Sequence, residues 1–86
     1  MTLDEIYAAL TLIFQDTFDD PGIKLRPDMT AADIRDWDSS NNLNLIIGAE
    51  IRFKLKFNMG EVEALQNVGD FADLIARRLD RQASGR

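Results

Sequence analysis

The 86-residue chain contains no cysteine and no histidine. Without cysteine it can form neither a disulfide framework nor a thiolate metal site, and without histidine it lacks the commonest zinc ligand and proton shuttle. No histidine of this chain can act as the general base that deprotonates a serine. Any chemistry on a serine must therefore be installed by a separate enzyme. The absence of cysteine is compatible with a reducing cytoplasm, where we expect the protein to reside.

The sequence also lacks a long apolar run and an excess of positive charge. No stretch approaches the roughly 18 apolar residues that a membrane span needs, and the acidic start Met1–Glu5 is unlike a secretory signal. The formal net charge is −5 and the sequence pI is about 4.5, which disfavours contact with phosphate backbones. We therefore expect neither a membrane span nor a nucleic-acid partner.

The charge is distributed unevenly along the chain. Residues 1–38 hold nine acidic and three basic residues, whereas residues 39–86 hold six acidic and seven basic ones. The two halves are therefore expected to present different surfaces to partners, unless the difference only reflects a solvated surface.

Apolar residues make up 45% of the chain, which is typical of one folded domain with one core. They recur every three or four positions from Leu3 to Phe18, which predicts an amphipathic helix. Thr2 and Glu5 have the spacing of a capping box at its start. The residues Asp19–Gly22, which include a proline and a glycine, predict its end.

The connection from residue 19 to residue 37 is long for a compact domain, so we expect it to carry structure of its own. Thr30–Asp33 has the pattern of a capped helical turn. The single tryptophan, Trp37, is predicted to be a packing anchor rather than a platform for a stacked ligand. Five apolar side chains are predicted to fix the connection to the core: Ile23, Leu25, Met29, Ile34 and Trp37.

A second helix is predicted from Ser39 to Phe53, with Asp38 as its N-cap. Gly48 within it predicts a close approach to a neighbour or a small gap in the core. The inward face is expected to comprise Leu43, Ile46, Ile47, Ala49 and Phe53. The outward face is expected to comprise Asn41, Asn44, Glu50 and Arg52.

The remaining sequence predicts an extended segment over 53–57, a short helix capped by Asn58, and a last helix from the cap Asn67 to Leu79. Arg77 and Arg78 are expected in the last turn, and residues 80–86 are expected to form a flexible C-terminal tail. The expected fold is all-α: a small bundle of three main helices plus one short helix, with a long loop between the first two main helices. It forms one domain over residues 1–79.

The most informative motif is Asp38-Ser39 at the start of the second predicted helix. A serine there exposes its hydroxyl at a helix end whose backbone N–H groups favour phosphate. In this setting the sequence resembles the acyl carrier proteins, whose hallmark is Asp-Ser-Leu at the start of the second helix and whose serine carries 4′-phosphopantetheine. The resemblance covers Leu3 to Leu79, including the family's order of helices and its long first loop.

The resemblance implies that Ser39 carries 4′-phosphopantetheine taken from coenzyme A, and that Asp38 helps a phosphopantetheinyl transferase to position its magnesium ion and coenzyme A. Ser40 stands where the family has a leucine that belongs to an apolar docking patch. A carrier of this kind is expected to be a monomer without catalytic activity or a metal ion of its own. Contacts with acyl-loading and acyl-transfer enzymes are implied for Leu43, Asn44 and Ile47.

Besides Ser40, the charge of the second helix departs from the family pattern. Family members that serve bulk fatty-acid synthesis present an acidic second helix, whereas Glu50 is the only acid from residue 39 to residue 57 here. We therefore expect a specialised carrier of acyl or aminoacyl groups, serving a dedicated lipid or secondary-metabolite pathway. The competing hypothesis is a carrier-fold interaction module without the prosthetic group, which the same two departures favour. An enzyme is not expected, because no paired acid–base constellation stands out.

Overall fold

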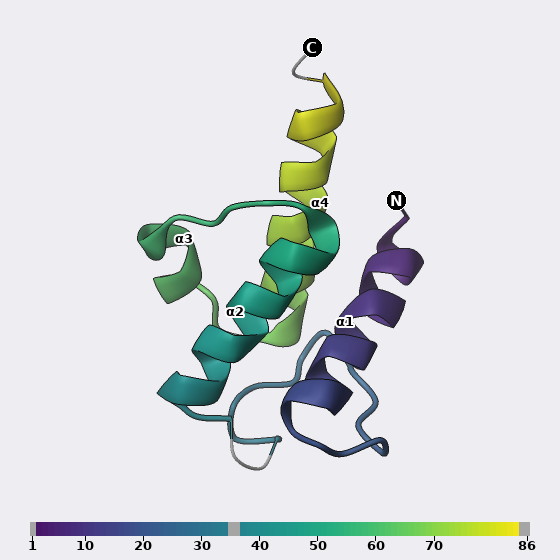
Figure 1. The fold of residues 1–86 in the computed structure, drawn as a ribbon, viewed down its shortest axis with the longest axis vertical. Helices are drawn as coiled ribbons and strands as arrows, with labels where there is room; N and C mark the ends of the chain where they lie inside the picture. The colour runs from purple at the N-terminus through teal and green to yellow at the C-terminus, as the bar shows by residue number, and fades with distance from the viewer. Residues whose placement is uncertain (1, 35–36, 85–86) are drawn as a thin grey trace.

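The computed structural model describes residues 2–34 and 37–84, apart from the side chains of Ser39 and of residues 81–84. Within these residues there are four helices and no strand: α1 (Leu3–Thr17), α2 (Ser39–Phe53), α3 (Met59–Glu63) and α4 (Val68–Ser84). In Figure 1, α2 crosses the front of the molecule, with α1 on one side and the short α3 on the other. The prediction of an all-α bundle with a long first loop is confirmed. None of the helices described is long and apolar enough to cross a membrane.

The predicted capping box begins α1. The Thr2 N–H donates to Glu5 Oε1 at a nitrogen–oxygen distance of 2.7 Å, and the Glu5 N–H donates to Thr2 Oγ1 at 3.2 Å. The hydrogen bond from Thr2 lowers the pKa of the Glu5 carboxyl, because it favours the charged form. At the other end, Phe18 caps the helix and Asp19 adopts a left-handed backbone with φ of 50°. The chain therefore turns away from α1 at the predicted position.

The core is formed by apolar side chains from the three long helices and the connection before α2. Ile6, Leu10 and Phe14 of α1 are almost fully buried, as are Leu45 of α2 and Ile75 of α4. Apart from Leu74, the buried apolar residues of α1, α2, α4 and the loops form one continuous cluster. Burial of these apolar side chains supplies most of the free energy that holds the helices together.

The inward face predicted for α2 is partly wrong. Leu43 and Ile47 were expected inside but are 60% and 44% exposed, whereas Leu45 is fully buried. Residues two positions apart lie about 200° apart around a helix, so Leu43 and Leu45 point to nearly opposite sides. The second helix carries two apolar stripes, and helical periodicity alone does not say which stripe faces the core. Ile46, Ala49 and Phe53 are buried as predicted.

Gly48 lies where α2 approaches α1 closely. A Cβ atom at this glycine would stand 3.1 Å from Ile13 Cγ2 of α1. The first of the two interpretations of Gly48, a close approach to a neighbour, is therefore correct.

Backbone hydrogen bonds tie the connection between α1 and α2 to the start of α4. The Val68 N–H donates to the Met29 carbonyl at 2.9 Å, and the Gly69 N–H donates to the Pro27 carbonyl at 2.8 Å. These donors belong to the first turn of a helix, where N–H groups have no partner within the helix. Ile23, Met29 and Ile34 are buried, while Leu25 and Trp37 pack against the core, as predicted.

The last helix continues beyond the boundary predicted at Leu79. Asn67 caps it as expected, because Asn67 Oδ1 accepts the Asp70 N–H at 2.7 Å, but the helix ends at Ser84. The sequence has no glycine or proline between residues 80 and 84 to stop a helix. Arg77 and Arg78 therefore lie inside α4 rather than in its last turn. Arg78 forms an ion pair with Glu61 of α3, with 3.0 Å between Nε and Oε2.

Replacing Gly69 by alanine should destabilise the protein, although alanine normally favours a helix. A Cβ atom there would lie 2.9 Å from the Pro27 carbonyl oxygen, so the loop and α4 must separate. We expect Gly69→Ala to lower the free energy of unfolding by about 1–3 kcal/mol in urea denaturation.

Gly60→Ala is the matched control, because a Cβ atom at Gly60 in α3 would make an ordinary 3.6 Å contact with Asn58 Oδ1. It should leave stability unchanged or raise it by up to about 1 kcal/mol. A Gly69→Ala protein as stable as the wild type would mean that this contact between loop and helix does not constrain the fold.

Candidate functional site

Asp38 begins α2 as its N-cap, as the sequence predicted. Its backbone is extended, with φ of −116° and ψ of −172°, and its Oδ1 accepts the Asn41 N–H at 3.0 Å. Its carbonyl accepts the Asn42 N–H at 2.8 Å. No acidic residue lies in the first turn of α2 itself, and Asp38, as the N-cap, places its carboxylate at the positive end of the helix dipole.

Ser39 is the first residue of α2, directly after the cap. Its side chain lies outside the part of the chain that the structure describes. Ser40 follows as the second helical residue and is exposed. Both serines therefore stand at the end of the helix whose N–H groups favour an anion.

Trp37 fixes the start of α2 against the core. Its ring meets the ring of Phe14 edge to face, with 5.3 Å between the ring centroids. Its Nε1–H donates to Asn42 Oδ1 at 3.1 Å. The predicted role of Trp37 as a packing anchor is confirmed. One tryptophan thus links the C-terminal part of α1 to the first turn of α2.

Two adjoining hollows lie beside this helix start. The first, of about 340 Å³, runs from Trp37 and Asp38 to the residues before and within α4. The second, of about 600 Å³, lies between α2 and α3 and is mostly apolar. Asn42 and Leu65 line both hollows. A hollow of mixed polar and apolar lining beside Asp38 therefore adjoins an apolar groove.

The far walls of these hollows were not predicted as part of a site. They contain Phe71 of α4, and Met59 and Val62 of α3. For this region the sequence predicts a short helix capped by Asn58, and the apolar residues Val62 and Leu65 within and after it fit a short apolar face. The direction of the connection between α2 and α3 decides which helix this apolar face contacts. No local sequence pattern predicts that direction.

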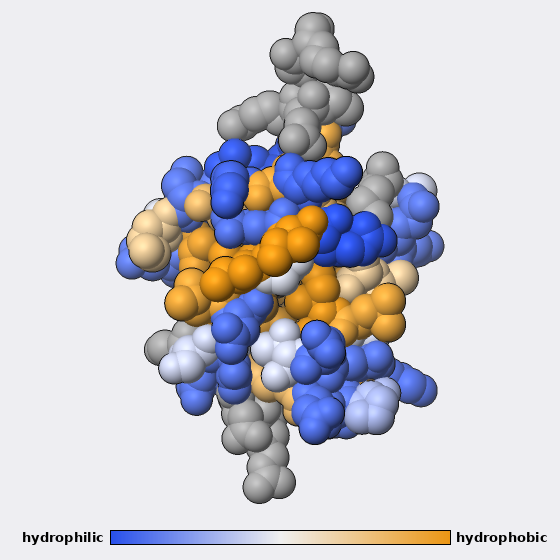
Figure 2. Space-filling model, viewed as in Figure 1, coloured by the Kyte–Doolittle hydropathy of each residue, from blue (hydrophilic) through white to orange (hydrophobic). Residues whose placement is uncertain are grey.

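The predicted partner contacts lie on one exposed face of α2. Ser40, Leu43, Asn44 and Ile47 are all exposed, and Ile51 extends the row with 73% of its surface exposed. At about 100° per residue these five positions fall within roughly 100° of one another around the helix. Figure 2 shows apolar side chains gathered in a band across this front of the molecule.

Within the described part of the chain, no group of three or more acidic, histidine or cysteine side chains could hold a metal ion. Glu50, the acid within α2, accepts the Phe57 N–H at Oε2 over 3.0 Å and so orders the segment after the helix.

Comparison with solved structures finds a protein of the same fold. The chain is similar to the solution NMR structure of a holo acyl carrier protein from Geobacter metallireducens, with 45% sequence identity and a TM-score of 0.85. The match covers 99% of this chain and 93% of that chain. No protein-family model and no curated protein matches the sequence.

The role of Asp38 as a cap can be separated from its charge by two substitutions. Asp38→Ala removes the acceptor of the Asn41 N–H and should cost about 1 kcal/mol of stability. Asp38→Asn keeps an oxygen acceptor and loses only the interaction of the charge with the helix dipole, about 0.3–1 kcal/mol at low salt.

Thermal or urea unfolding at low and high salt measures both effects. The deficit of Asp38→Asn should shrink as salt screens the dipole, whereas most of the deficit of Asp38→Ala should persist. Equal deficits at every salt concentration would contradict a capping role for the Asp38 side chain.

Proposed function

The chain belongs to the acyl carrier protein family, and from this premise we propose that it carries acyl or aminoacyl groups as thioesters on a 4′-phosphopantetheine arm attached to Ser39. The observation that carries the proposal is the position of Ser39, the first residue of α2 behind the Asp38 cap. The similar Geobacter structure is of a holo protein, the form that bears the prosthetic group. A thioester needs a thiol, and this chain without cysteine must obtain it from the arm.

A phosphopantetheinyl transferase would install the arm from coenzyme A. The Ser39 oxygen forms the new bond to phosphorus, adenosine 3′,5′-bisphosphate leaves, and the serine proton passes to a base on the transferase. The phosphodiester that results is an anion at the positive end of a 15-residue helix with no acid in its first turn. The helix dipole and the N–H groups of that turn stabilise such a charge. Asp38 is the residue that would orient the magnesium ion and coenzyme A on the transferase.

The two adjoining hollows supply a place for the arm. The polar side chains in the first hollow, Asp38, Asn42 and Asn67, suit the amide groups of the arm, and the apolar groove between α2 and α3 suits an acyl chain. Leu43, Ile46 and Val62 line that groove. The protein would thus shield its cargo between deliveries and act as a carrier rather than as an enzyme.

The neutral face of α2 supports a specialised carrier in a dedicated lipid or secondary-metabolite pathway. We further propose that this carrier works in the cytoplasm as a monomer. Ser40, Leu43, Asn44 and Ile47 offer apolar and amide groups but no charge to loading and transfer enzymes. The second candidate function is an interaction module of the same fold without the arm. Ser40 in place of the family leucine favours it, because a transferase loses an apolar contact there.

The attachment site is tested by intact mass after incubation with coenzyme A and a broad-specificity transferase. The wild type and Ser40→Ala should each gain the mass of one phosphopantetheinyl group, and Ser39→Ala should gain none. Ser40 is the matched control, because it is the neighbouring hydroxyl in the same helical turn.

Modification of Ser39→Ala together with its loss in Ser40→Ala would move the attachment site to Ser40. Failure of every variant to gain mass, including with the transferase from the same source, would favour the interaction module. Circular dichroism of each variant checks that the helices remain formed.

Replacing Ser40 by leucine should make the protein a better transferase substrate. Ser40 is exposed on the same face as Leu43 and Ile47, so a leucine there extends an apolar contact area. Burying half of such a side chain contributes about 1 kcal/mol, which corresponds to a rate increase of roughly fivefold at limiting substrate.

Ala8→Leu adds the same side chain to an exposed position of α1 and serves as the control. It should leave the rate of modification unchanged. A rate for Ser40→Leu that equals or falls below that of the wild type would mean that the serine fits a different partner surface.

A further inference from the structure

A further hollow adjoins the apolar groove between α2 and α3, at the end of the groove that lies away from Ser39. This far hollow has a volume of about 890 Å³, and Ile51 and Leu55 are among the residues that line it. Ile47 and Glu50 line both the groove and the far hollow. The two spaces therefore meet beside one turn of α2, the turn that ends at Glu50.

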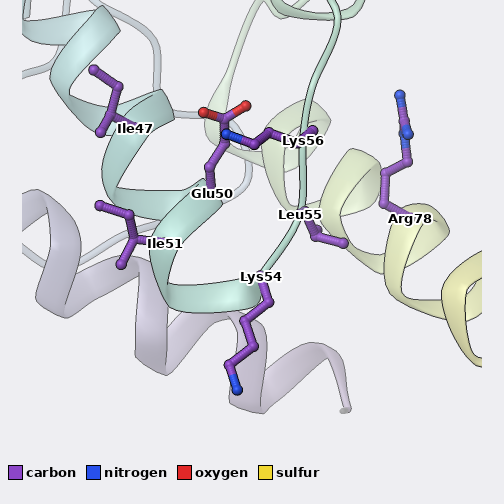
Figure 3. A pocket seen from close by; sticks show the side chains of 7 residues that line it. All are labelled: Ile47, Glu50, Ile51, Lys54, Leu55, Lys56 and Arg78. Carbon is purple, nitrogen blue, oxygen red and sulfur yellow. The ribbon is translucent and has the colours of Figure 1, made fainter.

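Glu50 holds the segment that passes from one space to the other, residues 55–57, here called the strap. Leu55 of the strap lines the far hollow, and Phe57 lines the groove. The Glu50 carbonyl accepts the Leu55 N–H at 3.1 Å, and Glu50 Oε2 accepts the Phe57 N–H at 3.0 Å. Figure 3 shows the Glu50 side chain pointing from α2 towards this segment. The Phe57 ring packs against the Phe71 ring of α4, with 6.1 Å between the ring centroids, so the strap is fixed from both sides.

The lining of the groove changes from apolar to charged at Glu50. Leu43 and Ile46 line the groove nearer to Ser39, whereas Glu50 is the single acid from residue 39 to residue 57. A hydrocarbon chain that covers a carboxylate removes its water, and this desolvation costs more free energy than the burial of one methylene group gains. An acyl chain in the groove should therefore end before it reaches Glu50.

The distance from Asn42 to Glu50 sets the length of chain that the groove can enclose. Asn42 also lines the hollow beside Asp38, and so stands at the near end of the groove. The eight residue steps from Asn42 to Glu50 correspond to about 12 Å of helix. Tetrahedral carbons joined by bonds of about 1.5 Å advance about 1.3 Å each, so about nine carbons span this distance.

We propose that Glu50 sets the length of the acyl chain that this carrier shields, at about 8–10 carbons, by closing the end of the groove. The proposal rests on the proposed function and deepens it, because it names medium-chain acyl groups as the cargo. A short acyl or aminoacyl group would fill little of the groove. A longer chain would leave its end in water or would have to displace the strap.

The test compares acyl chains of increasing length on the wild-type protein. Hexanoyl, octanoyl, decanoyl, dodecanoyl and hexadecanoyl groups are loaded from their coenzyme A thioesters by a broad-specificity transferase, and each product is verified by intact mass. The rate at which neutral hydroxylamine cleaves the thioester measures how often the cargo leaves the groove. From hexanoyl to octanoyl each added methylene should slow cleavage by up to about fourfold, the ratio for full burial. Beyond decanoyl the rate should stop falling.

Three substitutions identify the residue that limits the length. Glu50→Ala removes the barrier between the groove and the far hollow, so dodecanoyl should be cleaved about tenfold more slowly than on the wild type. Glu50→Gln keeps the shape and an acceptor for the Phe57 N–H, and its amide is also costly to cover, so the limit should remain. Glu63→Ala is the matched control, because it removes an exposed carboxylate from the opposite wall of the same groove. It should also keep the limit.

Carbon-13 methyl spectra locate the end of the chain. In the wild type the methyl groups of Ile46 and Val62 should shift with octanoyl, whereas those of Ile51 and Leu55 should shift with no chain. In Glu50→Ala the Ile51 and Leu55 methyl groups should shift with dodecanoyl and hexadecanoyl. The wild-type spectra test the proposal independently of whether Glu50→Ala folds.

Three results would overturn the proposal. The first is cleavage that continues to slow up to hexadecanoyl on the wild type, or shifts of Ile51 and Leu55 there. The second is an unchanged limit in a Glu50→Ala protein whose helices are formed by circular dichroism. The third is cleavage independent of chain length in every variant, which would mean that the groove holds no acyl chain.

Failure of the arm to attach is a separate outcome, which intact mass detects before any chain lengths are compared. Ser39→Cys then gives the chain a single thiol. Bromoacetamides with a spacer as long as the arm attach the same alkyl chains to this thiol without a transferase. Methyl shifts that stop before Ile51 and Leu55 would support the limit at Glu50 although the proposed function had failed. Shifts of these two residues would overturn the limit as well.

Discussion

The attachment of the long α1–α2 connection to α4 is the constraint on which the rest of the site depends. Pro27 and Met29 give their carbonyls to the first N–H groups of α4, and Gly69 lets the two backbones meet. The connection is thereby fixed in its middle, and Trp37 fixes its end against Phe14. These contacts fix the backbone that leads into Asp38 and Ser39. The start of α2 therefore keeps a fixed position relative to the core.

Local signals accounted for where the helices begin and for the ends of α1 and α2. The bounds of α2 and the caps Thr2, Asp38, Asn58 and Asn67 agree with the sequence analysis, because a cap is a bond between a side chain and a backbone group three residues away. The end of α4 was missed, because a chain of helix-forming residues without glycine or proline has no local stop.

The contacts between helices could not be predicted from local sequence signals in the same way. The exposure of Leu43 and the burial of Leu45 depend on which of two apolar stripes α1 and α4 cover. The walls of the two hollows come from α3 and α4, which follow α2 in the chain at distances that periodicity does not encode. The position of the Asp38-Ser39 motif at the start of α2 could nevertheless be predicted, because the motif and the helix are adjacent in sequence. The role of Ser39 as an attachment site follows from family membership and remains a proposal about this chain.

The placement of Trp37 gives the protein a built-in optical reporter. It is the single indole of the chain, and it lines the hollow that begins at Asp38 while its Nε1–H is held by Asn42. Its emission responds to the polarity and hydrogen bonding of that one location. An occupant of the hollow changes both, so intrinsic fluorescence can follow loading and release in real time without an added dye.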